Sequence, residues 1–513
     1  MIFTSSLLYD LIGILVALVV VIISSMLWAL TYWKRQNIFH IKPSFPFGNA
    51  KDFLFGRRAI FDIFDEFYAE AKKANASHGG FYILSLPAYI PIAPAVIKNI
   101  LQNDFQYFVD RGVYYNEKHD PISAHLFNLE GNKWKELRAK LSPTFTSGKM
   151  KSMMPIVVEI TERLIKIIDK EPIKDGLEMK EYMARLTTDV IGSIAFGIEC
   201  NCIENPDAEF RKYAKILLDG MSTFSGILVD VFPNLMKFLG VRAVPAKFSD
   251  FFTKAVKDII DYRETNNVKR KDFLDLLIQL KNRGNIDNEA NSDISEKTKI
   301  TLDMLLAQAF IFYLGGFETT STTLSFLLYE LGGNQEVQDK LRKEVFDVLQ
   351  RHGNQITYDA LSEMKYMDMV VNETLRKYPP LRVLIRVCNQ DYHVPGSETT
   401  IKKGIKVIVP INSIQYDPEY YPNPEVFDPD RFTEENKKKR HPFTFIPFGE
   451  GPRICIGMRF GVMQTKCGLA MLLKNYKFEL NTKTARPLKI SIDKGLTAVE
   501  GGIFMNLTKI KEN

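Results

Sequence analysis

The 513-residue sequence predicts a mainly α-helical fold with small β-sheets, preceded by one N-terminal transmembrane helix. Apolar residues recur at helical spacing in long runs, whereas strand-like runs are short, and neither a βαβ alternation nor an internal repeat is visible. The clearest runs are helical at 149–169, 179–196 and 337–350 and strand-like at 80–86 and 406–410. An uncharged stretch at 11–33 is long enough to cross a bilayer.

Residues 1–36 form the predicted membrane anchor. As a helix, its uncharged stretch spans about 35 Å. One acid precedes the stretch and two bases follow it, so the N-terminus is expected outside and the rest of the chain in the cytosol, with Tyr32 and Trp33 as interface aromatics. Prolines and a glycine over 37–50 predict a stiff linker, which leaves 51–513 as the main domain. In a eukaryotic cell this pattern indicates a single-pass protein of the endoplasmic reticulum membrane.

The net charge and the cysteines limit the possible binding partners and the cellular compartment. The net charge of +6 is a mild excess that favours an anionic membrane surface or an acidic partner, and it is too diffuse to indicate nucleic acid. The cysteines are few, odd in number and scattered, which is typical of a reducing compartment. They are Cys200, Cys202, Cys388, Cys455 and Cys467.

Two further segments stand out from the helical pattern. Residues 221–239 are apolar but interrupted by proline, so they form either buried core or a substrate-channel cap that dips into the membrane. Residues 281–299 are polar and nearly free of large apolar side chains, which predicts a solvated loop.

The stretch 445–460 surrounds Cys455 with two glycines and a proline, which predicts a tight loop followed by a helix. A cysteine at the mouth of a helix faces unpaired N–H groups and the positive end of the dipole, which favour thiolate. Such a thiolate could be a nucleophile, a buried apolar side chain or a ligand to a soft metal centre. No nearby histidine offers a base, and no further cysteines at short spacing offer a thiolate cluster. Besides a packed structural cysteine, what remains is a centre with its own ligands and one axial thiolate, which is haem.

The spacing Phe448-x-x-Gly451-x-Arg453-x-Cys455-x-Gly457 resembles, without a gap, the haem-binding loop of cytochromes P-450. The resemblance implies the fold of that family and a haem-thiolate monooxygenase domain, with Cys455 as axial ligand of the iron of haem b. Arg453 and Phe448 would contact the cofactor. The resemblance also implies use of O2, electrons from NADPH through a flavoprotein reductase, and cytochrome b5 as an optional partner.

Residues 301–331 keep helical spacing for about eight turns, with Gly315 and Gly316 in the middle. A mid-helix glycine costs about 1 kcal/mol against alanine, so these two indicate either close packing of another helix or a widened groove. Together with Glu318 and Thr319 they resemble the oxygen-activation motif of the same family. By that resemblance Thr319 would position a water, and Glu318 would help to relay protons toward bound oxygen.

Glu373 and Arg376 lie three residues apart and therefore on one helix face. Residues 424–432 resemble the family's P-x-x-F-x-P-x-R-F segment, which contributes Arg431. The resemblance implies that the three form a buried charged cluster behind the haem that fixes the cysteine loop.

Trp134 and Arg138 have a W-x-x-x-R spacing that puts indole and guanidinium on one helix face. Guanidinium matches carboxylates such as haem propionates. The resemblance implies that both residues, with Arg453, hold the propionates, and it adds Arg386 and Arg111 as further candidates. An acidic reductase would dock on a basic face outside the cysteine loop, formed by Lys133, Lys135, Lys140, Arg459 and Lys466.

Residues 107–112, 120–127 and 141–150 resemble the family-six insect microsomal branch. Its members commonly oxidise plant toxins and insecticides, so a lipophilic substrate class is implied. The expected substrate pocket contains Phe127, Ile311, Phe312, Leu381 and Leu496. Three alternatives stay open: an endogenous hormone or lipid hydroxylase, a haem-thiolate isomerase or dehydratase, and a non-catalytic ligand carrier.

Overall fold

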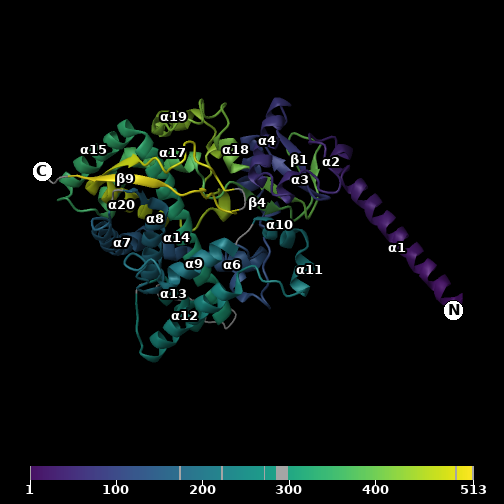
Figure 1. Ribbon diagram of the computed structural model, residues 1–513, viewed down its shortest axis with the longest axis horizontal. Coiled ribbons are helices and arrows are strands. Elements are labelled where there is room, and N and C mark those ends of the chain that lie inside the picture. The colour runs from purple at the N-terminus through teal and green to yellow at the C-terminus, as the bar shows by residue number, and fades with distance from the viewer. Residues whose placement is uncertain are drawn as a thin grey trace. The chain divides into compact units, whose positions relative to one another are not determined.

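The computed structural model describes residues 2–172, 175–220, 223–270, 272–284, 299–491 and 494–510 (Figure 1). The chain divides into two compact units. The smaller unit consists of Met1–Asp110 and Val383–Ile414, and the larger unit of Arg111–Arg382 and Gln415–Asn513. The loop predicted at 281–299 lies almost entirely outside the described residues.

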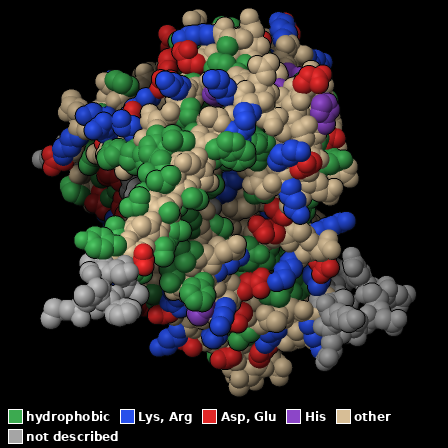
Figure 2. Space-filling view, turned by 90° about the vertical axis from the view of Figure 1, so that its right-hand side faces the viewer, with side chains coloured by type: hydrophobic (Ala, Val, Ile, Leu, Met, Phe, Trp, Pro, Cys, Tyr) green, Lys and Arg blue, Asp and Glu red, His purple; other side chains and the backbone are tan. Residues whose placement is uncertain are grey.

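The N-terminal helix α1 (Ile2–Ala29) extends as a straight rod from the smaller unit (Figure 1). Its segment Tyr9–Ala29 is apolar and long enough to span a membrane, and none of it is buried. In Figure 2, which looks at the side of the molecule where α1 lies in Figure 1, green hydrophobic side chains form a broad diagonal band. An apolar helix that no protein surface covers is expected of a membrane anchor.

The residues that follow the predicted membrane-spanning helix pack into the protein and do not lie exposed at a membrane–water interface. Helix α2 (Tyr32–Arg35) buries Trp33, whose indole Nε1 donates to the Phe81 carbonyl at 3.0 Å. Gly80 makes this possible, since a Cβ there would lie 2.1 Å from the Trp33 ring. The expectation that Trp33 is a membrane-interface aromatic is therefore wrong: the indole is a core side chain of the smaller unit.

A four-stranded sheet of order β1-β2-β7-β4 forms the centre of the smaller unit. Strands β1 and β2 are antiparallel, β2 and β7 parallel, and β7 and β4 antiparallel. Helix α4 packs Phe64 and Phe67 edge-on against Phe81 of β1. The bounds are β1 (His78–Ile83), β2 (Leu86–Pro91), β4 (Leu384–Val387), β7 (Lys406–Val409), the pair β5 (Tyr392–His393) and β6 (Thr400–Ile401), α3 (Lys51–Leu54), α4 (Ile60–Lys73), α5 (Pro94–Lys98) and α18 (Ile411–Gln415).

The larger unit is helical and is built around α14 (Leu302–Gly333). Buried side chains cover most sides of this helix, as expected of a core helix. Its closest companion is α8 (Met179–Ile191): a Cβ on Gly316 would lie 2.5 Å from Ile191 Cδ1. Because glycine has no side chain, the two helices approach closely at this point.

Of the other helices of the larger unit, α12, α13, α15, α17 and α20 contact α14, and a small antiparallel sheet of order β3-β9-β8 lies beside it. The helices are α6 (Gly131–Leu141), α7 (Ser147–Ile168), α9 (Glu209–Gly220), α10 (Thr223–Val231), α11 (Pro233–Phe238), α12 (Ala246–Thr265), α13 (Phe273–Arg283), α15 (Gln335–Arg351), α16 (Tyr358–Glu363), α17 (Lys365–Lys377), α19 (Glu434–Lys439) and α20 (Met458–Asn475); the strands are β3 (Leu177–Glu178), β8 (Tyr476–Leu480) and β9 (Phe504–Lys509). The predicted mainly helical fold with small sheets is confirmed.

Candidate functional site

The stretch around Cys455 forms a closed loop. Gly449 and Gly451 adopt φ values of +73° and +72°, which side chains disfavour, and the Cys455 N–H donates to the Phe448 carbonyl at 2.9 Å. Helix α20 begins only at Met458, with Gly457 preceding it. Cys455 therefore lies three residues ahead of the helix, at the end of the loop.

The Cys455 side chain is exposed, yet protein surrounds it so closely that burial raises the pKa of the thiol. Protein atoms therefore crowd around the sulfur while part of the side chain stays accessible. The Gly457 N–H and the charges of Arg138 and Arg111 lower the pKa, but burial outweighs them. The expectation that the loop by itself favours the thiolate form of Cys455 is therefore wrong. A metal ion bound to the sulfur would supply the positive charge that stabilises the thiolate.

A set of contacts joins the cysteine loop to α6 and to the loop before it. The Arg453 guanidinium lies 4.1 Å over the ring of Trp134 and donates to the Leu129 carbonyl at 2.7 Å. Arg111 donates to the carbonyls of Phe127 at 3.0 Å and of Arg453 at 3.2 Å. Four of the residues singled out in the sequence, from three separate segments, are in contact here.

Arg138 lies one helical turn after Trp134 and is half-buried. Burial lowers the pKa of its guanidinium, and the charge of Cys455 raises it. The two side chains are therefore within electrostatic reach of each other, as a cation beside a thiolate would be.

Arg386 lies on β4 in the smaller unit and is fully buried. Its Nη1 donates to the carbonyl of neighbouring Ile385, whereas Nε and Nη2 have no hydrogen-bond partner among the described residues. Burial lowers its pKa to about 10. A buried guanidinium with two unsatisfied donors calls for an anionic acceptor, and a cofactor carboxylate fits that need.

The middle of α14 has two different glycines. Gly316 is required by the packing on α8, whereas a Cβ on Gly315 would meet no atom of the described residues within 4 Å. The Thr319 hydroxyl donates to the Gly315 carbonyl at 2.8 Å, next to that open side. Both explanations of the glycine pair therefore apply, one to each residue.

Glu318 is buried and points toward α8. Lys180 Nζ donates to its Oε1 at 2.8 Å, and Oε2 has no hydrogen-bond partner among the described residues. The oxygen-activation motif predicted Glu318, but no sequence pattern near Lys180 indicated that this lysine would bind it, since the two residues are 138 positions apart. This lysine is a residue that sequence reasoning missed.

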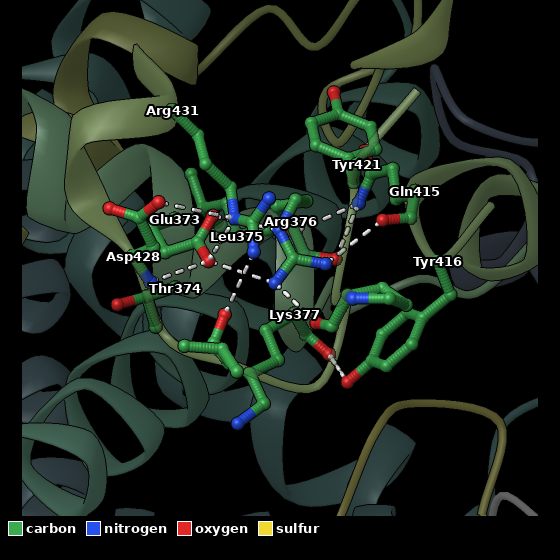
Figure 3. A network of polar contacts seen from close by, with 12 residues as sticks. Glu373, Thr374, Leu375, Arg376, Lys377, Gln415, Tyr416, Tyr421, Asp428 and Arg431 are labelled. Atoms are coloured by element: carbon green, nitrogen blue, oxygen red, sulfur yellow. Dashed lines mark hydrogen bonds and ion pairs between the residues drawn. The ribbon is translucent and has the colours of Figure 1, made fainter. Parts of the chain in front are cut away.

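Glu373, Arg376 and Arg431 gather as expected from their motifs (Figure 3). Arg376 binds Glu373 with two hydrogen bonds of 2.7 and 2.8 Å, and Arg431 Nε lies 3.4 Å from Glu373 Oε1. Glu373 and Arg376 are completely buried, and Arg431 is nearly so. Burial raises the pKa of Glu373, which makes both cations necessary if the carboxylate is to stay charged.

Gln415 connects this cluster to the cysteine loop. Arg376 Nη1 donates to the Gln415 carbonyl at 3.0 Å (Figure 3). The side-chain Oε1 of Gln415 accepts the N–H of Ile446 at 3.2 Å. Its amide also donates to the carbonyl of Arg376 at 2.9 Å. Gln415 was absent from the sequence prediction because no motif contains it.

The predicted pocket residues come together only in part. Phe312 on α14 stacks on Phe145 at 5.2 Å, and the Phe145 ring also lies against Gly457. The Arg111 guanidinium covers one face of Phe127 at 3.9 Å. Ile311, Leu381 and Leu496 are half-buried. The backbone next to Leu496 bonds to the segment before Leu381, since Thr497 N–H donates to the Pro380 carbonyl at 3.0 Å. Phe145 was not predicted.

The predicted basic face is smaller than the sequence suggested. Lys466 is buried and donates to Asp368 at 2.6 Å, and burial lowers its pKa, so it is not a free surface cation. Lys133 forms an ion pair with Glu117 at 2.8 Å. A cavity of about 480 Å³ borders this side of the cysteine loop, with Phe448 and Arg459 in its wall.

Comparison with known proteins gives a consistent result. A family model described as Cytochrome P-450 matches residues 46–504. Probable cytochrome P-450 6a23 of Drosophila melanogaster is 42% identical over 486 residues, which cover 94% of this chain and 95% of that protein. Cytochrome P-450 6A1 of Musca domestica is 41% identical, with 99% of each chain covered, and cytochrome P-450 6k1 of Blattella germanica is 41% identical, with 93% of each covered.

Proposed function

Because the chain belongs to the cytochrome P-450 family of monooxygenases, we propose that it oxidises lipophilic small molecules, chiefly foreign compounds such as plant toxins and insecticides. The observation that carries the proposal is the Cys455 thiol, which is accessible within dense protein and lies within reach of Arg138. The narrower alternative, a hydroxylase of an endogenous hormone or lipid, uses the same chemistry on one substrate.

The residues fit a haem group. Cys455 would be the ligand of the iron, Phe448 and Arg453 would line the loop side, and Trp134, Arg138 and Arg111 would serve the propionates. The contact of the Arg453 guanidinium with the Trp134 ring supports this, because it brings a cation and an aromatic side chain of the expected set together beside the cysteine loop. Arg386, in the smaller unit, remains a further candidate for a propionate; its two unpartnered donors suit an anionic acceptor. When bound, haem would supply oxygen activation, and the Cys455 thiolate would favour that chemistry by donating electron density.

The side chains of the protein would position the cofactor loop and the substrate and would deliver protons. The hydroxyl of Thr319, beside the open side of Gly315, would hold a water, and Glu318 would bring a proton to it. Glu373, Arg376 and Arg431, linked through Gln415, would keep the cysteine loop in place. Half-buried apolar side chains such as Phe127, Ile311, Phe312, Leu381 and Leu496 would exclude water and hold a lipophilic substrate.

Electrons would come from NADPH through a flavoprotein reductase, with cytochrome b5 as an optional second donor. Arg459 and the exposed Lys135 remain candidates for the docking face. The apolar helix α1 supports a single-pass location in the endoplasmic reticulum membrane, with residues 51–513 as the cytosolic catalytic domain. Helix α11 exposes Leu235 and Phe238, which supports a channel cap that touches the membrane.

The test is reconstitution of the full-length protein with a cytochrome P-450 reductase and a panel of lipophilic plant compounds and insecticides. We expect NADPH-dependent oxygen insertion into several members of the panel. Turnover of a single hormone-like compound would favour the endogenous hydroxylase. Spectral shifts on ligand addition without any NADPH consumption would favour a ligand carrier and contradict the proposal, as would turnover of peroxide substrates alone.

A further inference from the structure

The cavity of about 480 Å³ beside the cysteine loop lies entirely within the larger unit. Its wall is formed by α16, by the first half of α17 and by parts of the stretch 445–466. Small-molecule sites in proteins commonly have volumes of about 300–1,000 Å³. The cavity is therefore large enough for one small organic molecule.

Most of the cavity wall is apolar. Leu361 of α16, Phe448 of the cysteine loop and Val462 of α20 form part of it. Two methionines of α20, Met458 and Met463, also line it. Because the methionine side chain is unbranched and polarisable, it adapts to apolar groups of different shape. One part of a matching ligand is therefore an apolar chain.

Charged side chains occur at a few points of the same wall. The Lys466 ammonium is matched by Asp368, to which it donates at 2.6 Å. Arg459 and Lys365 are exposed, and neither forms an ion pair among the described residues. Two cations of the wall therefore stay available to a ligand.

The other polar side chains of the wall do not cancel this positive charge. Glu450 is half-buried, and burial raises its pKa, which favours the neutral form of the carboxyl group. The Asn372 side chain offers an amide that has no hydrogen-bond partner in the described part of the chain. The wall thus carries an excess of positive charge, so the polar part of a matching ligand is an anion.

We propose that this cavity binds an amphipathic carboxylate with a single apolar chain. The carboxylate pairs with Arg459 and Lys365, and the chain lies against the apolar part of the wall. The bound ligand covers Arg459, a candidate for the docking of the electron donor, and so slows the entry of electrons. This regulatory effect rests on the proposed function, whereas the binding itself does not.

The first test is photolabelling of the full-length protein with decanoate that carries a diazirine on its chain, followed by mass spectrometry of the labelled peptides. We expect labels within 358–372 and 445–466. Decylamine with the same diazirine is the matched probe of opposite charge, and it should label these segments about tenfold less, since the unpaired cations repel it. No label in these segments, or equal labelling by the amine, would overturn the proposal.

Variants of the wall separate specific binding from general stickiness. Val462→Trp fills the apolar part of the cavity, and Arg459→Met combined with Lys365→Met removes the two cations. Each should reduce labelling by decanoate about tenfold. Lys437→Met, which changes an exposed lysine of α19 outside the wall, should label as wild type. Because Arg459 and Lys365 are exposed, the charge variant decides the question even if Val462→Trp does not fold; unchanged labelling in it would contradict the proposal.

The second test measures electron entry in the reconstituted holoenzyme. We expect decanoate to raise the concentration of reductase that gives half-maximal reduction, and to leave reduction by dithionite, which needs no docking, unchanged. Val462→Trp should lose this response to decanoate. Labelling of the cavity without any effect on reduction by the reductase would contradict the regulatory role. If the reductase does not reduce the wild type at all, the proposed function fails, whereas the labelling result still decides whether the cavity binds the carboxylate.

Discussion

Replacement of Arg376 by methionine is expected to destabilise the protein by about 3–5 kcal/mol, because it strands a buried carboxylate. Arg376 donates two hydrogen bonds to Glu373, one to the Gln415 carbonyl at 3.0 Å and one to the Pro424 carbonyl at 2.7 Å. Neither Glu373 nor Arg376 has any exposed surface. Arg431 remains near Glu373, but only at 3.4 Å, so it compensates in part.

The assay is a double-mutant cycle on urea unfolding of the full-length protein, with Arg376→Met, Glu373→Met and both changes together. The double variant removes both charges at once, so its loss of stability should be smaller than the sum of the single losses by about 2 kcal/mol or more. Lys437→Met, which breaks an exposed ion pair with Glu434, should leave stability unchanged within error. Additive single losses would refute the account of the cluster as a mutually dependent buried network.

Two further predictions concern α8 and α14. Burial would raise the pKa of Glu181, but the cations Arg211, Arg185 and Lys215 outweigh it and lower that pKa from an ordinary 4.5 to about 2. The Glu181 carboxylate therefore stabilises the fold above pH 4.5, and this stabilisation is lost as the pH falls toward 2. Urea unfolding of Glu181→Gln should therefore vary less with pH in that range, by about 2 kcal/mol after allowance for solvent screening; an unchanged pH dependence would contradict the assignment. Gly316→Ala should destabilise the protein, since Ile191 must move, whereas Gly315→Ala should be neutral or more stable by up to about 1 kcal/mol, as measured by thermal unfolding. Equal effects of the two changes would contradict the packing described for α14.

The helices were the predictable part of the fold. A helix that buries one face shows apolar residues at a 3.6-residue period, and a helix that is buried on most sides shows a long apolar run. Residues 179–196 correspond to α8 followed by a π-helical turn, Gly192–Phe196. Strands such as β3 and β5, of two residues each, are too short to give any period. Trp33 was misplaced because its surroundings depend on Gly80, which is distant in the sequence.

The site residues also fall into two groups, those that the sequence could predict and those that it could not. Motif residues such as Cys455 and Thr319 are visible because the chemistry requires certain residue types at fixed local spacing. Lys180 and Gln415 bind these segments from far along the chain, and any long polar side chain at those positions looks like an ordinary surface residue in the sequence. Lys466 shows the reverse error, since a lysine expected on a docking face is buried against Asp368.

The most direct test of the central claim is the absorption spectrum of the reduced, carbon monoxide-bound protein. We predict the thiolate-type band in the wild type and in Cys467→Ser, which changes a buried cysteine of α20. Cys455→Ala should lose that band even when haem is retained, because the axial sulfur is gone. A thiolate-type band that persists in Cys455→Ala would contradict the assignment of Cys455 as the axial ligand.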